Sequence, residues 1–181
     1  QFKYLTLGDN ITTITKNAFK DCSNIIDISI SNAVNIDNIG EGAFQNCENI
    51  KTFFMPRRVT ILKNNLFKGC TKLQNINFGS PDNIQKIEDN VFQNCNISQF
   101  TLFKTLTSIG DNILGGNNNL DNITLNSNGL IKLADDLSQL IRTDSIKYVT
   151  LGKEITEMKS TLFDEIKSTL EKVVFGENIK K

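Results

Sequence analysis

The sequence predicts an α/β solenoid, with a parallel β-sheet of about eight short strands on one face and short helical or irregular segments on the other. Three observations favour this class. They are a repeat of nearly constant length, an alternation of polar and apolar residues within each repeat, and a Phe and a Cys at fixed positions between the alternating segments. A repeat of this size cannot bury a core alone, so successive repeats must stack on one another.

The repeat length follows from an apolar triplet that closes each unit. The middle residue of this triplet recurs in steps of 23, 25, 23, 24, 23, 26 and 24 residues. It occurs at Leu5, Ile28, Phe53, Ile76, Phe100, Ile123, Val149 and Val173. Polar and apolar residues alternate around each of these positions, which is typical of a short strand with one buried face. About 20 residues then return the chain to the next strand, which allows one parallel strand per coil.

The segment Ala-Phe-x-x-Cys is expected on the opposite side of the coil, as a turn of helix or an irregular segment. We expect its Phe to fill the space between the sheet and the back wall, at Phe19, Phe44, Phe67 and Phe92. The cysteines recur at separations of 25, 23 and 25 residues, so they share one inward position in four coils: Cys22, Cys47, Cys70 and Cys95.

We interpret these cysteines mainly as buried free thiols, because free Cys behaves as a small, commonly buried apolar residue. A disulfide between stacked neighbours and a metal site are the alternatives. The metal site is the weaker of the two, since zinc ligands usually stand about two to four residues apart and the chain has no histidine.

The complete pattern is I-x-x-I-x-x-x-A-F-x-x-C-x-x-L-x-x-I-x-L, and its cleanest copies are residues 11–30 and 59–78. It resembles the BspA-like class of leucine-rich repeats, over nearly the whole chain and most strongly at residues 11–102. This resemblance implies a surface or secreted protein of bacteria or protozoa that binds host or matrix proteins. It places the chain at the cell surface or outside the cell.

The second half of the chain departs from the pattern. Leu114 and Asn117 stand where the pattern has Phe and Cys, and Ile166 stands where the last repeat would have Cys. The unit at residues 130–151 is longer, and residues 134–140 predict one or two helical turns. We interpret these later units as degraded or specialised repeats.

We interpret residues 1–181 as a single solenoid of about seven to eight repeats. Both ends fall in the middle of a repeat and no polar capping unit is recognisable, so we expect a segment of a longer protein. The sequence also lacks an apolar run of about 18 residues that could span a membrane. We therefore expect no direct membrane insertion by this segment.

Composition narrows the function. Twenty basic and twenty acidic residues give a net charge of zero, which argues against electrostatic binding of nucleic acid. The absence of histidine removes the usual Ser-His and Cys-His catalytic pairs, and no Gly-rich phosphate loop is present. We therefore expect neither an enzyme nor a bound cofactor or metal.

The outward face of the sheet remains as the candidate functional surface. Its predicted columns hold mainly small polar residues, with Phe54 and Phe103 as aromatic exceptions. We expect these two rings, with Arg57 and Tyr148, to contact a protein or glycan partner, because aromatic and Arg residues anchor interfaces. For Phe54, cover by a neighbouring loop or an inward turn is the alternative. A structural spacer without a ligand is the second hypothesis for the whole chain.

Overall fold

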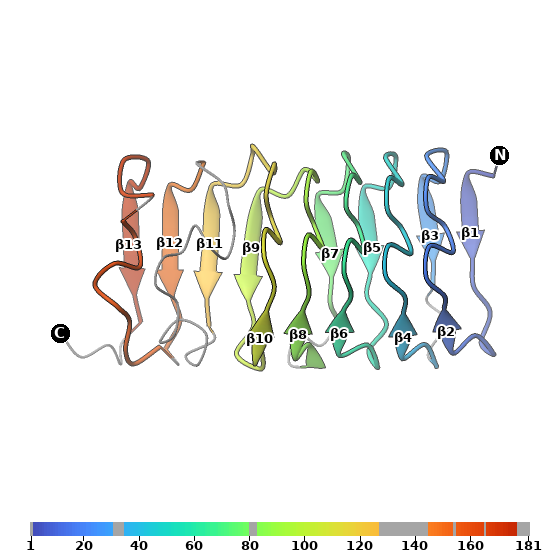
Figure 1. The fold of residues 1–181 in the computed structure, drawn as a ribbon, viewed down its shortest axis with the longest axis horizontal. Helices are drawn as coiled ribbons and strands as arrows, with labels where there is room; N and C mark the ends of the chain where they lie inside the picture. Colours follow the sequence, from blue (N-terminus) through green and yellow to red (C-terminus); the bar gives the residue numbers. More distant parts are fainter. Residues whose placement is uncertain are drawn as a thin grey trace.

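The computed structural model describes residues 2–30, 35–79, 83–126, 145–153, 155–164 and 166–176. They form an elongated parallel β-solenoid, in which each coil adds to the end of the preceding one and β1 and β13 lie at opposite ends (Figure 1). Within these ranges no helix has the length and apolar character of a membrane span.

Strands of three or four residues make up the front sheet, eight of them in the described residues. They are β1 (Tyr4–Thr6), β3 (Asp27–Ser29), β5 (Thr52–Phe54), β7 (Asn75–Asn77), β9 (Gln99–Leu102), β11 (Asn122–Leu125), β12 (Tyr148–Leu151) and β13 (Lys172–Phe175). All pairs among them are parallel, and the paired middle residues are the predicted ones, as in Leu5 opposite Ile28 and Phe53 opposite Ile76. The predicted register of the front strands is therefore confirmed wherever they pair.

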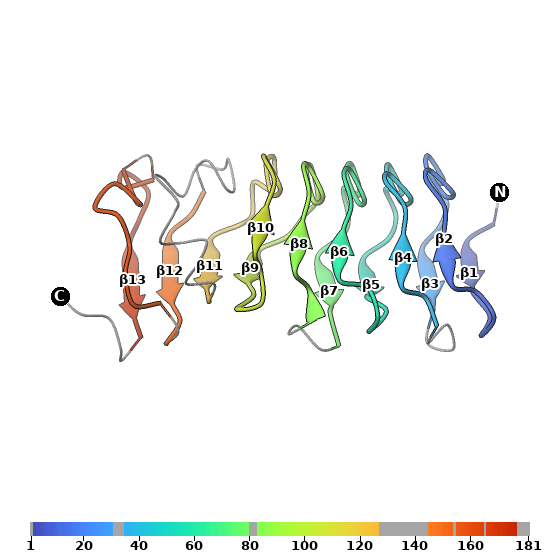
Figure 2. The ribbon, with the colours of Figure 1, turned by 60° about the horizontal axis from the view of Figure 1, so that its bottom comes forward.

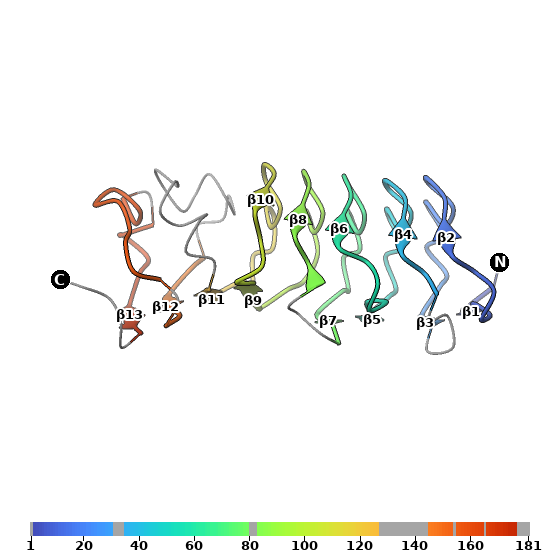
Figure 3. The same ribbon diagram turned by 90° about the horizontal axis from the view of Figure 1, so that it is seen from below.

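A second ladder of two-residue strands runs along the back of the solenoid and was not predicted. Its members are β2 (Thr13–Ile14), β4 (Asn38–Ile39), β6 (Ile61–Leu62), β8 (Lys86–Ile87) and β10 (Ser108–Ile109). β2 pairs with β4, and β6, β8 and β10 form a continuous group. Figures 2 and 3 show this ladder on the side of the coil opposite the front sheet. The second residue of these strands is buried in β2, β4, β6 and β8 and half-buried in β10, so the back ladder supplies a second apolar row to the core.

The Phe segments are turns, and no α-helix occurs in the described part of the chain, which corrects the expected α/β class and the helical segments. Two residues per coil have positive φ, such as Asn17 at 57° and Asp21 at 61°, and this conformation interrupts a right-handed helix. Within each Phe segment, some backbone amides donate to the next coil and others donate within the segment. Phe19 N donates to Ala43 O in the next coil (2.8 Å), whereas Cys22 N donates to Phe19 O (3.2 Å). The helical turns expected at residues 134–140 lie outside the described residues.

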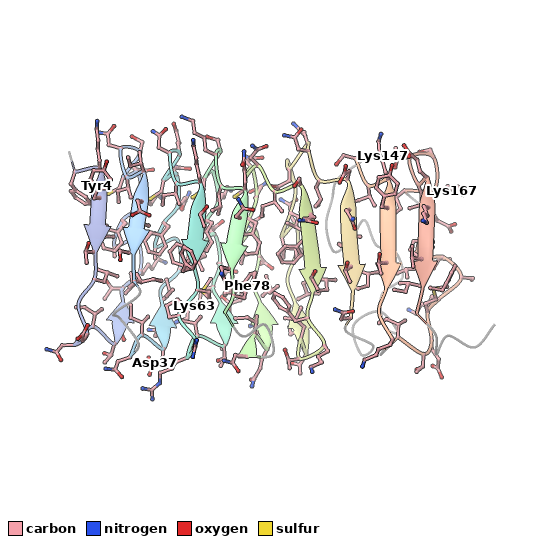
Figure 4. All side chains as sticks on the ribbon, turned by 180° about the vertical axis from the view of Figure 1, so that it is seen from behind. Tyr4, Asp37, Lys63, Phe78, Lys147 and Lys167 are labelled. Atoms are coloured by element: carbon pink, nitrogen blue, oxygen red, sulfur yellow. The ribbon has the colours of Figure 1, made fainter. Side chains whose placement is uncertain are left out.

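The predicted Phe column is confirmed as the centre of the core. Rings 19, 44, 67 and 92 stack with centroid separations of 5.5, 5.7 and 5.9 Å and interplanar angles of 6–7°. Phe44, Phe67 and Phe92 are fully buried. Phe53 from the front sheet meets Phe67 edge-on at 4.7 Å, which joins the column to the sheet. Figure 4 shows the side chains that fill the space between the two ladders.

The four cysteines are free thiols, three of them buried and Cys22 half-buried. The thiols of Cys47, Cys70 and Cys95 donate to the carbonyl oxygen of the Phe in the preceding coil, at 3.1, 3.1 and 3.2 Å. Burial raises the pKa of Cys47 and of Cys95 to about 12, so both are protonated at neutral pH. In the next coil Asn117 occupies the same position, and its Nδ2 donates to Phe92 O at 2.8 Å.

Candidate functional site

The front sheet is interrupted at two places, which we call the first break (between β3 and β5) and the second break (between β7 and β9). Five other interfaces share one hydrogen-bond arrangement. In it two successive amides donate to one carbonyl of the preceding coil, as Ile26 N and Asp27 N do to Lys3 O. Within the described residues the two breaks lack this arrangement. Figures 1 and 4 agree that β7 and β9 are the most widely spaced neighbours of the front sheet.

The loops that precede the two breaks are longer than those after β1, β5 and β9. Six positions separate the middle residue of the front strand from the first apolar residue of the back motif after β1, β5 and β9, as from Leu5 to Ile11. Eight positions separate them after β3 and β7, as from Ile28 to Ile36. Each break therefore follows a front strand with the longer loop. The back strands β8 and β10 remain paired, so the second break is confined to the front.

The first break opens a hollow of about 800 Å³, the Phe54 hollow, lined by residues of β3, by residues 54–57 and by Asn77 and Gly79. Strand alternation positions the ring of Phe54, since Phe53 points into the core and is fully buried. The Phe54 side chain is 55% exposed, as predicted. The structure therefore presents an exposed aromatic ring beside the first break, and Tyr4, Tyr148 and Val174 are further exposed large side chains on the front strands.

Arg57 lies beside the same hollow and is exposed, as expected. Its aliphatic stem lies beside Gly79, just after the end of β7. A Cβ added to Gly79 would lie 3.8 Å from Arg57 Cγ. Its carbonyl oxygen accepts a hydrogen bond from Asn83 Nδ2 at 2.6 Å, which holds the backbone in place. Asp27 contributes an acidic side chain from β3. The hollow thus combines an aromatic ring with one cationic and one anionic group.

The expectation that Phe103 is exposed is wrong. Phe103 is only 7% exposed and packs edge-on against Phe78, with ring centroids 4.7 Å apart, and near Phe100 at 6.3 Å. Phe103 follows the end of β9, where strand alternation no longer fixes the direction of the side chain. The ring turns inward and fills the space behind the second break.

Tyr148 is 37% exposed on β12, so its ring is accessible. Its hydroxyl donates to Glu171 Oε2 at 2.8 Å, and Lys147 Nζ lies 3.1 Å from Glu171 Oε1. The hydrogen bond from Tyr148, then that from Lys147, lowers the pKa of Glu171, and the same bond raises the pKa of Tyr148. β7, β9 and β11 separate β12 from β5, so the structure does not bring Tyr148 and Phe54 together.

A second hollow of about 390 Å³ lies at the second break and was missed by the sequence reasoning. Gln74, Gln99 and Thr101 contribute to its polar lining, and Ile76, Phe78 and Phe100 to its apolar lining. The sequence feature that coincides with both hollows is the longer loop after β3 and after β7. Within the described residues no group of three or more His, Cys, Asp or Glu side chains is arranged to hold a metal ion.

Comparison with protein families agrees with this geometry. The family model described as the BspA type leucine rich repeat region matches in six copies, over residues 1–121 and 37–171. Among curated proteins no match was found.

Several solved structures share the fold. A leucine-rich repeat protein from Bacteroides ovatus superposes with a TM-score of 0.69 at 20% identity, covering 99% of this chain and 46% of its own. A leucine rich cell surface protein from Faecalibacterium prausnitzii gives 0.62 at 20% identity, covering 98% and 56%. The pneumococcal vaccine antigen PcpA gives 0.65 at 15% identity, covering 98% and 52%. The chain thus spans about half the length of each of these three proteins.

Proposed function

Because the chain belongs to the BspA-type leucine-rich repeat family, we propose that it is a recognition or adhesion module that binds a protein or glycan partner through its front sheet. Two of the similar structures are described as a cell surface protein and as a vaccine antigen. These descriptions support a location at the cell surface or outside the cell for this chain as well.

The observation that carries the proposal is the exposed ring of Phe54 above a hollow in the front sheet. A Phe side chain buries a large area when a partner covers it and loses little conformational entropy, so such rings often dominate binding energy. Arg57 beside it adds a cation that can pair with a carboxylate or a backbone carbonyl of the partner. Tyr148 is a separate contact candidate further along the same face.

Binding of Phe54→Ser and Ile61→Ser variants tests this proposal. Ile61 is also an exposed apolar residue, at 39%, but it lies on β6 in the back ladder, so it is a matched control. The immobilised chain would be exposed to purified extracellular-matrix proteins and to a glycan array. For any ligand retained by the parent, we expect Phe54→Ser to weaken binding at least tenfold and Ile61→Ser to leave it unchanged.

Circular dichroism and thermal melting check the folding of each variant, and we expect a small loss of stability because neither side chain is buried. Equal binding by the parent and Phe54→Ser would place the recognition surface elsewhere. Retention of no ligand from either set would favour the structural spacer, which holds other domains apart without a ligand of its own.

A further inference from the structure

The second break leaves two strand edges facing one another without a backbone ladder. Asn126 N donates to Leu102 O (2.9 Å) and Asn122 N to Ser98 O (3.4 Å), so the backbone groups of residues 98 and 102 are directed toward β11. In a parallel ladder alternate residues bond to opposite neighbours. The amides and carbonyls of Gln99 and Thr101 are therefore directed toward β7, and no backbone hydrogen bond between β7 and β9 occurs in the described residues.

The facing edge of β7 is equivalent. Met55 N donates to Asn77 O at 2.7 Å, so residues 75 and 77 bond toward β5. The backbone of Ile76 is consequently directed into the break. Both edges therefore direct backbone donors and acceptors into the break.

Hydrogen bonds between the same two coils close the break at both ends of the strands. Asn96 N donates to Leu73 O at 3.0 Å just before the strands, and Thr105 Oγ1 donates to Ile84 O at 2.7 Å after them. The opening is therefore as long as the strands themselves. It coincides with the second hollow, whose lining includes Phe78, the residue labelled at the end of β7 in Figure 4.

We propose that the second break is a docking slot for an extended polypeptide segment of the partner, which adds a strand between β7 and β9. Strand addition satisfies main-chain donors and acceptors on both sides of the incoming segment, and this mode of recognition depends on an open sheet edge. The slot differs from an ordinary sheet edge because it offers two edges to one strand. This inference rests on the proposed function and deepens it, since it names the partner's chemistry on the same sheet face.

The floor of the slot restricts the incoming sequence. Phe78 and Phe103 meet edge-on with centroids 4.7 Å apart, and Phe100 lies behind them. Side chains of the added strand that point inward must therefore be small, such as Gly, Ala or Ser. The outward side chains would lie beside Gln99 and Thr101 of β9, so polar residues are favoured there.

The test uses a peptide with the sequence Asp-Asn-Ala-Thr-Ala-Asn, which copies residues 121–126 with alanine in place of Ile123 and Leu125. Titration into the ¹⁵N-labelled chain should shift the amides of Gln99, Thr101 and Ile76 saturably and slow their hydrogen exchange. The same peptide N-methylated at both alanines keeps its side chains but loses two donors, so we expect its binding to be at least tenfold weaker. A peptide with phenylalanine at both alanine positions should also bind at least tenfold more weakly.

Protein variants provide the matched control. Gln99→Pro removes the amide that faces the slot, whereas Gln99→Ala removes the polar side chain and keeps that amide, so Gln99→Pro should bind the peptide at least tenfold more weakly than Gln99→Ala. Proline is tolerated at strand edges, and thermal melting verifies the fold. If Gln99→Pro fails to fold, the N-methylated peptide still decides the question.

Three results would overturn the slot: no saturable shift with the alanine peptide, equal binding of the N-methylated peptide, or shifts confined to the Phe54 hollow. Phe54→Ser should leave peptide binding unchanged. If Phe54→Ser abolishes capture of a matrix protein or glycan while the peptide does not bind, the proposed function holds and the slot fails. If the peptide binds and Phe54→Ser has no effect on capture, the slot holds and the role of Phe54 in the proposed function fails.

Discussion

Truncation of Phe67 should be among the most destabilising changes in the chain. The ring is fully buried, stacks on Phe44 at 5.7 Å and on Phe92 at 5.9 Å, and meets Phe53 edge-on at 4.7 Å. Phe→Ala in a core typically costs about 3–5 kcal/mol, from lost transfer energy and the residual cavity. Three aromatic contacts and a rigid column that cannot collapse place Phe67→Ala in the upper half of that range.

Phe54→Ala is the comparison that isolates burial from residue type. Phe54 is 55% exposed, so its truncation loses less than half of the burial that truncation of a fully buried Phe would lose. It also leaves no enclosed cavity. We expect a cost of about 1 kcal/mol, from partial burial of one aromatic side chain. The difference between the two variants should therefore be about 3 kcal/mol.

Guanidinium denaturation followed by far-ultraviolet circular dichroism measures both values. Because solenoid stability is approximately a sum over coils and their interfaces, the effect of Phe67→Ala should also be local. Hydrogen exchange should accelerate more in β6–β8 than in β12 and β13. Equal losses of free energy at positions 54 and 67, or a loss below about 1 kcal/mol at Phe67, would refute this assignment of the core.

Three further predictions concern close contacts between coils. Gly40→Ala should cost about 1–3 kcal/mol, because the added Cβ would clash with the backbone nitrogen of Lys16. Gly8 has open space around it, so Gly8→Ala should leave the denaturation midpoint nearly unchanged. Asn117→Ala should cost about 2–3 kcal/mol by leaving the buried amide of Ile97 unpaired, and a melting curve checks this loss. Ionising Cys47, whose pKa rises from 9.0 to about 12 on folding, favours the unfolded chain. The contribution of this thiol to stability in urea should therefore be constant well below pH 9 and fall as the pH rises from about 9 toward 12.

The periodic features of the fold could be predicted from the sequence. The apolar positions recur often enough to fix the strand register, and the Phe column follows from the same count. Cys and Asn117 occupy one position because each donates to the carbonyl of the preceding Phe, a shared role that the sequence pattern alone does not reveal. The strand register depends on the local pattern of apolar residues, so the sequence was sufficient to predict it.

The turns could not be predicted in the same way, because their hydrogen bonds depend on neighbouring coils. Phe19 N bonds to the next coil rather than four residues back along its own segment, so helix propensity does not decide this region. Asn17 and Asp21 were the available signal, since both residue types tolerate positive φ. Phe103 lies beyond the end of its strand, where alternation gives no direction.

Site-specific photo-crosslinking tests the central claim, that the front sheet contacts a partner, most directly. Benzoylphenylalanine would replace Phe54 in one sample and Ile61 in another, and each chain would be irradiated with the matrix proteins that the parent retains. We predict covalent adducts from position 54 on the front sheet and none from position 61 on the back ladder. Adducts of equal yield from both positions, or from position 61 alone, would contradict the account.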